Sequence, residues 1–269
     1  MNKLDNDIKY VNSILNKQCE DIFGFIYSRT NENLVKLFEK INLVNKDVYT
    51  VMSSSDILFS ALTNGAKKVD CFDINPITYR YFHLRKWLLN WKYIDADGLS
   101  ISDLLFIVKH SKPISKDEQE SQIFWQYFLN KIDNIHFYSN ILFEYIEKPD
   151  VPYKNKIYEL REIMNNLIIK YNNIDMASKL IDSKETYDII FLTNILDYNR
   201  NDAQKINIIC ENLYNLLKRN GSIICSQIPQ YSELLNKEKV VFQNHFNYEE
   251  LFIDKKEQQK ILYYKYVKK

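Results

Sequence analysis

Residues 47–91, DVYTVMSSSDILFSALTNGAKKVDCFDINPITYRYFHLRKWLLNW, alternate between strand and helix patterns in a way that decides the fold. The apolar run at residues 48–52 predicts a strand, which ends at the polar cluster Ser53, Ser54, Ser55 and Asp56. Serine and aspartate suit turns and helix N-caps, so we expect a loop that leads into a short helix. Gly65 ends that helix at the position of a left-handed C-cap.

A second strand and a second helix follow. Residues 69–72 form the next apolar run, which stops at Asp73. Pro76 opens a helix, and one apolar stripe runs along it, made by Ile77, Tyr81, Leu84, Leu88 and Trp91. The stretch is therefore predicted to be a βαβ unit with an acid at the carboxyl end of its second strand.

Asp73 is the principal candidate for a ligand contact. Ligands of open α/β sheets lie beyond the carboxyl ends of the strands, and an aspartate roughly 20 residues after the first loop suits the two hydroxyls of an adenosine ribose. A role as a turn former is the alternative. The first loop contains no glycine, which disfavours a pyrophosphate-bearing dinucleotide. A cofactor with an amino acid end, met by serine hydroxyls and backbone N–H groups, fits this loop better.

Composition excludes several classes of protein. The chain has 269 residues, so it can bury a full core, in one domain or in one domain carrying a large insertion. Its net charge of +1 gives no strong signal for nucleic acid binding. The four cysteines are far apart and the histidines lack metal-ligand spacing, so a metal site is not expected. With no apolar signal core and no membrane span, we expect a cytoplasmic protein. The oligomeric state is not indicated.

The first 45 residues are predicted to be a helical segment, with apolar residues at helical spacing near residues 8–15 and 34–41. Thr30 or Asn31 could cap the second helix. Alternatively the polar segment between the helices is a lid over a cofactor, with Tyr27 and Arg29 reaching a carboxylate, because arginine offers a planar fork of donors.

Strand and helix patterns stop at residues 92–168, which are predicted to be a helical insertion, and then resume. Residues 167–169 and 174–176 suggest a third strand that ends at an acid, and residues 187–194 a fourth. A helix begins at Asp202 and ends at Asn220 and Gly221, and residues 222–226 form a fifth strand. The tail contains residues 239–242, a linker with residues 248–252, and residues 261–266, and its last two strands are expected to pair at one sheet edge.

These elements predict a doubly wound, mostly parallel, seven-stranded Rossmann-like α/β sheet over residues 46–269. The chain resembles the class I S-adenosylmethionine (AdoMet)-dependent methyltransferases, whose sheet ends in such an antiparallel pair. The resemblance rests on the pieces VMSSSD, CFDINP, NIDM, YDIIFLTNILDY and LLKRNGSIICS. Locally, SSSDILFSALTNGAKKVDCFDINP is most similar to the 3-amino-3-carboxypropyl transferases of betaine-lipid synthesis, although this first loop lacks their glycine.

The resemblance implies a role for each remaining candidate. The loop of Ser53, Ser54, Ser55 and Asp56 would receive the methionine end of AdoMet, with simple helix capping as the alternative. Asp73 and Asn75 would form the ribose turn. Ile74 and Met176 would enclose adenine, unless they are core residues, and Asp175 would accept from the adenine amine. Catalytic candidates are found at the end of the fourth strand, where Asn194 would line the sulfonium and Asp197 and Tyr198 would orient or deprotonate an acceptor, unless they are solvated turn residues.

The sequence thus predicts an AdoMet-dependent transferase, in first place a methyltransferase that acts on a small molecule. An aminocarboxypropyl transferase with the same cofactor is an alternative, because the sulfonium activates more than one carbon. A non-catalytic AdoMet-fold module is another, motivated by the glycine-free loop. A nucleotide-binding oxidoreductase is disfavoured because no G-x-G motif is present.

Overall fold

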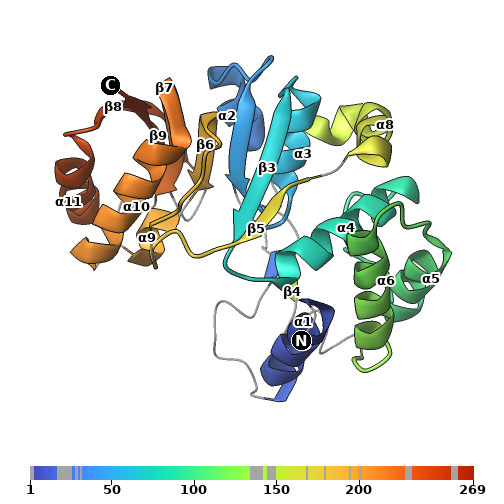
Figure 1. Cartoon of the computed structure of the whole chain (residues 1–269). Helices are drawn as coiled ribbons and strands as arrows, with labels where there is room; N and C mark the ends of the chain where they lie inside the picture. Colours follow the sequence, from blue (N-terminus) through green and yellow to red (C-terminus); the bar gives the residue numbers. More distant parts are fainter. Residues whose placement is uncertain are drawn as a thin grey trace. The chain divides into compact units, whose positions relative to one another are not determined.

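A computed structural model of the chain (Figure 1) describes residues 3–16, 26–27, 30, 32–133, 142–143, 150–167, 169–178, 180–193, 195–199, 202–227, 232–255 and 260–269. The chain divides into two compact units that alternate along the sequence. The helical unit comprises Met1–Asn31, Met52–Asp56 and Asp73–Ile168, and the sheet unit comprises Glu32–Val51, Ile57–Phe72 and Ile169–Lys269. The predicted boundary at residue 45 lies inside the sheet unit.

A seven-stranded sheet forms the sheet unit, in the order β5-β3-β2-β6-β7-β9-β8. Its strands are β2 (Asp47–Val51), β3 (Lys68–Asp73), β5 (Tyr171–Asn173), β6 (Tyr187–Thr193), β7 (Leu217–Gln227), β8 (Phe246–Lys255) and β9 (Lys260–Lys268). The pairs β2–β3, β2–β6 and β6–β7 are parallel, whereas β9 is antiparallel to both β7 and β8. The predicted seven-stranded, doubly wound fold is confirmed, and its sheet is mixed.

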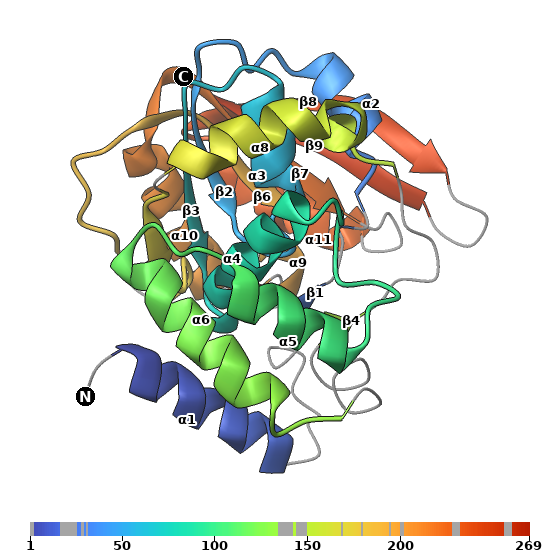
Figure 2. The ribbon, with the colours of Figure 1, turned by 90° about the vertical axis from the view of Figure 1, so that its right-hand side faces the viewer.

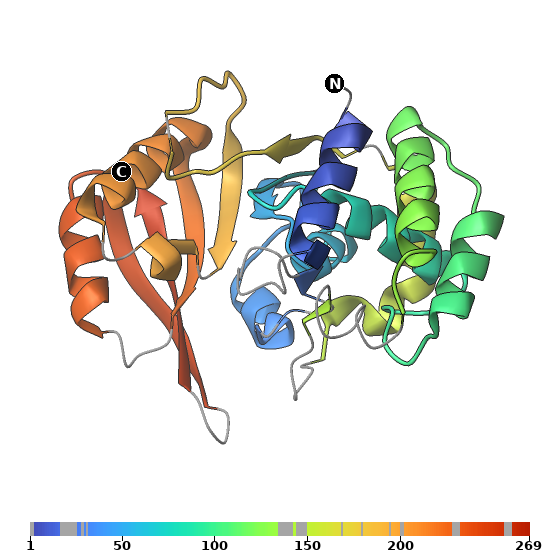
Figure 3. The same cartoon turned by 90° about the horizontal axis from the view of Figure 1, so that it is seen from below.

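Helices cover both faces of this sheet because the central strands are apolar on both sides. Ile190 and Leu192 of β6 belong to one buried cluster with Leu213 of α10 (Ala203–Leu216). Phe191, which lies between Ile190 and Leu192 in the sequence, points to the opposite face of the sheet. Its ring lies 5.6 Å from that of Phe38 in α2 (Leu34–Lys40). Figure 3 shows α10 and α11 (Ser232–Phe242) beside the long strands β7 and β9.

The helical unit contains α1 (Lys3–Asn16), α4 (Ile77–Asn90), α5 (Ile101–His110), α6 (Lys116–Leu129), η2 (Pro152–Lys156) and α8 (Ile157–Asn166). In Figure 2, α1 lies alongside α6, and residues of both helices share one apolar core with α4. The short strands β1 (Ile26–Tyr27) and β4 (Leu142–Phe143) pair in parallel, so the predicted insertion is not purely helical.

The prediction of a single apolar stripe on α4 is wrong. Every residue from Ile77 to Leu89 is buried, because α5, α6 and α8 pack against α4 and α1 shares its apolar core, whereas Trp91 is 39% exposed. The four basic side chains of this helix are buried with the rest, which periodicity of apolar residues could not reveal.

Four other predictions of local structure are corrected. Asn33, not Thr30 or Asn31, caps α2, because its side chain accepts the Lys36 N–H at 3.1 Å. The third strand is Tyr171–Asn173, which lies between the two predicted pieces and includes neither of them. The fifth strand begins at Leu217, so residues 220 and 221 lie within β7 and not at a helix end. In the tail, residues 239–242 are the last turn of α11 and not a strand, and the predicted linker at residues 248–252 lies within β8.

Tight packing explains why Gly221 lies within a strand. A Cβ at this position would lie 2.8 Å from Leu217 Cδ2 and 2.9 Å from the Lys218 carbonyl oxygen. The preceding Asn220 has φ 60°, and the register between β6 and β7 shifts here. The Asn-Gly pair therefore makes an irregularity in the strand.

None of the helices in the described ranges has both the length and the apolar character needed to cross a lipid bilayer. Within the same ranges, no group of three or more His, Cys, Asp or Glu side chains is arranged to hold a metal ion.

Candidate functional site

The loop after β2 adopts a glycine-like backbone without glycine. Ser53 has φ 41° and Ser55 has φ 68°, values that a Cβ disfavours and that glycine adopts readily. The Ser55 N–H closes a tight turn by donating to the Met52 carbonyl oxygen at 2.7 Å. Such strained backbone persists only where surrounding contacts hold it, and it is frequent at ligand sites.

One of these contacts comes from Asp73, the last residue of β3. Its Oδ2 accepts the Ser53 N–H and its Oδ1 accepts the Asn75 N–H, each at 2.9 Å. Burial raises the pKa of Asp73 to about 6, although hydrogen bonds from Asn75, Ser53, Thr78 and Ile74 lower it in part. The carboxylate therefore ties the loop after β2 to the turn after β3, and it titrates closer to neutrality than an exposed aspartate.

The two residues after Asp73 differ in exposure. Ile74 is 46% exposed, which leaves an apolar side chain in solvent beside the predicted ribose acid. Asn75 is buried, and its Oδ1 accepts the Ile77 N–H at 3.0 Å. Asn75 therefore helps to begin α4, and its predicted contact with a cofactor stays a prediction.

Asp56 lies at the first turn of α3 (Asp56–Thr63), buried among four donors. Its Oδ2 accepts the Thr30 N–H at 2.6 Å and the Ser54 hydroxyl at 2.9 Å. Its Oδ1 accepts Arg85 Nη1 at 2.8 Å and the Tyr153 hydroxyl. Because a carboxylate has about four acceptor positions, these groups saturate it. We therefore expect Asp56 to hold the loop in place through these hydrogen bonds and not to bind a ligand directly.

Arg85 of α4 is fully buried beneath the same loop. In addition to Asp56, its Nη1 donates to the Ser54 carbonyl oxygen, and its Nη2 donates to the Ile94 carbonyl oxygen and the Tyr153 hydroxyl, both at 2.8 Å. Burial acts to lower the pKa of Arg85, but Asp56 and Tyr153 outweigh it and hold the pKa well above the usual value. The guanidinium is therefore a permanent cation.

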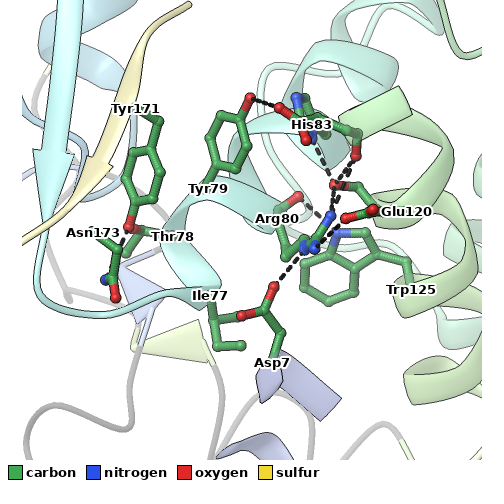
Figure 4. A network of polar contacts seen from close by, with 12 residues as sticks. Asp7, Ile77, Thr78, Tyr79, Arg80, His83, Glu120, Trp125, Tyr171 and Asn173 are labelled. Atoms are coloured by element: carbon green, nitrogen blue, oxygen red, sulfur yellow. Dashed lines mark hydrogen bonds and ion pairs between the residues drawn. The ribbon is translucent and has the colours of Figure 1, made fainter. Parts of the chain in front are cut away.

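A second buried polar network lies on α4 (Figure 4). Arg80 Nε donates to Asp7 of α1 at 2.8 Å, and its other nitrogens donate to Glu120 and Ser121 of α6. His83 Nδ1 lies 2.6 Å from the Ser121 hydroxyl. Burial, with Arg80 and Lys86 nearby, holds the pKa of His83 well below the usual value. This network joins α1, α4 and α6, and its histidine, His83, is neutral.

Sequence reasoning missed Arg80 and Arg85. One signal was available, since α4 carries Arg80, His83, Arg85 and Lys86 within two turns of an otherwise apolar helix. Basic residues so close to an apolar core are rarely buried without partners. Which acids would pair with them was not readable, because Asp7, Asp56 and Glu118 belong to other elements.

The remaining candidates belong to the sheet unit. Asp175 follows β5, and its Oδ1 accepts the Ala177 N–H at 2.9 Å. Met176 is 2% exposed within the core of the sheet unit, which favours core packing over contact with adenine. At the end of β6, Thr193 has φ 52°, a strained value for a β-branched residue. Asp197 and Tyr198 lie in α9 (Ile195–Asn199), and nothing is described of their side chains.

The side chains of three more predicted residues are also not described. Arg29 and Asn194 lie outside the described residues, and Tyr27 is described only as the second residue of β1. Their predicted contacts with a carboxylate or a sulfonium therefore stay predictions.

The chain matches no protein-family model and no curated protein. Among solved structures it is similar to N-methyltransferase NodS from Bradyrhizobium japonicum WM9 in complex with S-adenosyl-L-homocysteine, at 8% identity and a TM-score of 0.42, covering 96% of this chain and 98% of that one. It is also similar to a methyltransferase from Pyrococcus furiosus, at 10% identity and a TM-score of 0.41, covering 98% and 96%.

A TehB-like SAM-dependent methyltransferase from Corynebacterium glutamicum gives 10% identity and a TM-score of 0.42, covering 98% of this chain and 99% of that one. All three TM-scores lie below 0.5, so the likeness is too loose to assign a function. The strand order and the residues of the site have to carry that assignment.

Proposed function

We propose that this protein is an AdoMet-dependent transferase, in first place a methyltransferase that acts on a small molecule. One observation carries the proposal: the strand order β5-β3-β2-β6-β7-β9-β8, with β9 antiparallel, has the acid Asp73 at the carboxyl end of β3. A seven-stranded sheet that ends in an antiparallel pair, with an acid after its second predicted strand, is what the resemblance to class I methyltransferases implies. Ligands of doubly wound sheets bind beyond such strand ends.

Asp73 would hold the ribose of the cofactor. Its carboxylate accepts hydrogen bonds from backbone N–H groups, but the Thr78 hydroxyl, which also donates to it, can be replaced by a ribose hydroxyl. The Thr78 hydroxyl has a single hydrogen, which it donates to the Asn75 carbonyl oxygen at 2.8 Å and which also lowers the pKa of Asp73. A ribose hydroxyl can take the place of Thr78 at the carboxylate while Thr78 keeps its bond to Asn75.

The neighbouring residues suit the other parts of the same cofactor. Ile74 offers exposed apolar surface next to the ribose acid, as an adenine ring requires. The loop at residues 53–56 precedes α3, whose first turn presents backbone N–H groups to a carboxylate. Ser53, with an intermediate exposure, is the loop serine that remains available for direct contact, since Ser54 and Ser55 are each 1% exposed.

When bound, AdoMet supplies an electrophilic carbon next to its sulfonium. The residues of the chain then have to hold the cofactor, align an acceptor with that carbon and exclude water. Asp197 and Tyr198, which follow β6, remain the proposed residues for orienting or deprotonating the acceptor, and Asn194 for lining the sulfonium.

Isothermal titration calorimetry tests the proposal. We expect the protein to bind AdoMet or S-adenosylhomocysteine at micromolar concentration and to leave NADH unbound. Binding of NADH alone would overturn the assignment. Mass spectrometry of the spent cofactor then identifies the transferred group, because methyl transfer leaves S-adenosylhomocysteine and aminocarboxypropyl transfer leaves methylthioadenosine. Binding without turnover of any acceptor would instead favour a non-catalytic module.

A further inference from the structure

Two peptide groups determine the strained conformation of the loop at residues 53–56. The orientation of the peptide group before each residue is coupled to the φ of that residue. The left-handed φ of Ser53 is accompanied by a hydrogen bond from its own N–H to Asp73. The left-handed φ of Ser55 is accompanied by a hydrogen bond on the preceding carbonyl, that of Ser54, which Arg85 donates.

Arg85 is suited to hold that carbonyl. Its side chain is 0% exposed. Its two terminal nitrogens donate to four acceptors on four residues: Ser54 O, Asp56 Oδ1, Ile94 O and the Tyr153 hydroxyl. Tyr153 in turn donates to Asp56. The planar fork of a guanidinium can meet acceptors in several directions at once, whereas an ammonium on a flexible stem cannot keep the same geometry.

We propose that Arg85 is a positioning residue, which keeps the glycine-free loop in the backbone conformation that receives the cofactor. The role rests on the proposed function of this loop. Glycine adopts left-handed backbone at little cost, whereas serine needs external contacts to remain there. Arg85 supplies such a contact at the Ser54 carbonyl oxygen, and Asp73 supplies one at the Ser53 N–H. Tyr153 supports Arg85 through hydrogen bonds with Arg85 and Asp56. Arg85 does not touch the cofactor and acts through the Ser54 peptide group.

The proposal makes a specific prediction for paired substitutions. In Arg85→Lys the loop loses its hold on the Ser54 carbonyl, so the fraction of molecules with a competent loop falls, and the apparent affinity falls with it. We expect S-adenosylhomocysteine to bind about tenfold or more weakly. If the loss comes from backbone strain, Ser55→Gly removes that strain. The same Arg85→Lys change should then cost less than about threefold when made in the Ser55→Gly background.

Calorimetry on the four proteins of this cycle measures the coupling directly. A merely structural arginine would give the same loss of affinity in both backgrounds, and that result would overturn the proposal. Arg80→Lys is the matched control, since Arg80 is equally buried and ion-paired, with Asp7 at 2.8 Å. It should lower the melting temperature and leave the affinity for S-adenosylhomocysteine unchanged.

A milder variant guards against misfolding of Arg85→Lys. Tyr153→Phe removes one donor to Asp56 and one acceptor of Arg85 while the ion pair remains. It should show the same coupling with Ser55→Gly at smaller amplitude. Additive effects in this second cycle would also overturn the proposal.

Hydrogen exchange of the loop amides separates this inference from the proposed function. The N–H groups of Ser53 and Ser55 are both hydrogen-bonded, so without ligand they should exchange faster in Arg85→Lys. The Ser53 amide should slow again in the double variant with Ser55→Gly. If the wild-type protein binds no AdoMet analogue, the proposed function fails, and exchange alone decides the role of Arg85. Equal exchange rates in wild type and Arg85→Lys would refute it.

Discussion

Binding of S-adenosylhomocysteine should weaken as the pH falls through the pKa of Asp73. Burial raises that pKa to about 6, and only the ionised carboxylate forms a charge-assisted hydrogen bond with the ribose hydroxyl that takes the place of Thr78. With this pKa, Asp73 is ionised in about nine-tenths of the molecules at pH 7 and in about one-tenth at pH 5. The apparent dissociation constant of S-adenosylhomocysteine should therefore rise about tenfold from pH 7 to pH 5. The α-carboxyl and α-amino groups of the cofactor's amino acid end titrate well below and well above this interval.

Asp73→Asn tests the origin of this slope. An amide offers one acceptor oxygen, and its NH₂ group would face a backbone N–H, so affinity at pH 7 should fall by about 1–3 kcal/mol. Because the amide does not titrate, its affinity should then stay constant from pH 7 to pH 5. Asp70→Asn is the control, since Asp70 is a buried aspartate of the same strand, bonded to Tyr187 at 2.9 Å. This control should keep the tenfold slope.

Stability should change with pH in the opposite direction. The folded-state pKa of Asp73 lies above the unfolded value of 3.8, so its contribution to stability is present below pH 3.8 and is lost as the pH rises through about 6. The difference of about two pKa units corresponds to about 3 kcal/mol. Urea denaturation of wild type and Asp73→Asn at several pH values measures it. Calorimetry that gives a pH-independent affinity for the wild type would refute the ribose role of Asp73.

Three further predictions follow from the buried polar side chains. His83 is neutral when folded because its pKa is depressed, so the contribution of His83 to stability should be lost as the pH falls below about 6.5, by at most about 1.4 kcal/mol per pH unit, and comparison of wild type with His83→Gln in urea denaturation measures this contribution. Lys86 and Glu118 form a buried ion pair at 2.7 Å, so Lys86→Met should cost about 3–5 kcal/mol in unfolding free energy and shift the urea midpoint accordingly. Asn212 is 0% exposed, and its Nδ2 donates to the Met176 carbonyl oxygen at 2.8 Å, so Asn212→Leu should lower the unfolding free energy by about 1–3 kcal/mol.

Each of these has a result that would contradict it. The same pH slope in wild type and His83→Gln would assign the titration to another group. If Lys86→Met/Glu118→Leu is as unstable as Lys86→Met alone, the cost is lost packing and not an unpaired charge. An Asn212→Leu protein as stable as wild type would show that the turn after β5 finds other partners for its backbone.

The sequence by itself determined the elements whose causes are local. The apolar run and the serine cluster predicted β2 and its loop, and Gly65 has φ 85° as its place at a helix end requires. The acid that ends β3 was predicted at Asp73 because a strand, a turn former and a proline follow one another there. The doubly wound class of fold was accessible for the same reason, since alternating strand and helix patterns leave few topologies.

Only the tertiary structure decided which charges are buried and what they hold. Arg85 meets Asp56 from 29 positions away and Tyr153 from 68, and Arg80 meets Asp7 from 73. No local pattern encodes such pairs, because they depend on helices that pack from several sides of α4. The same contacts explain why a loop without glycine can take glycine's backbone conformation: strain at Ser53 and Ser55 is local, but the groups that offset it come from distant parts of the chain.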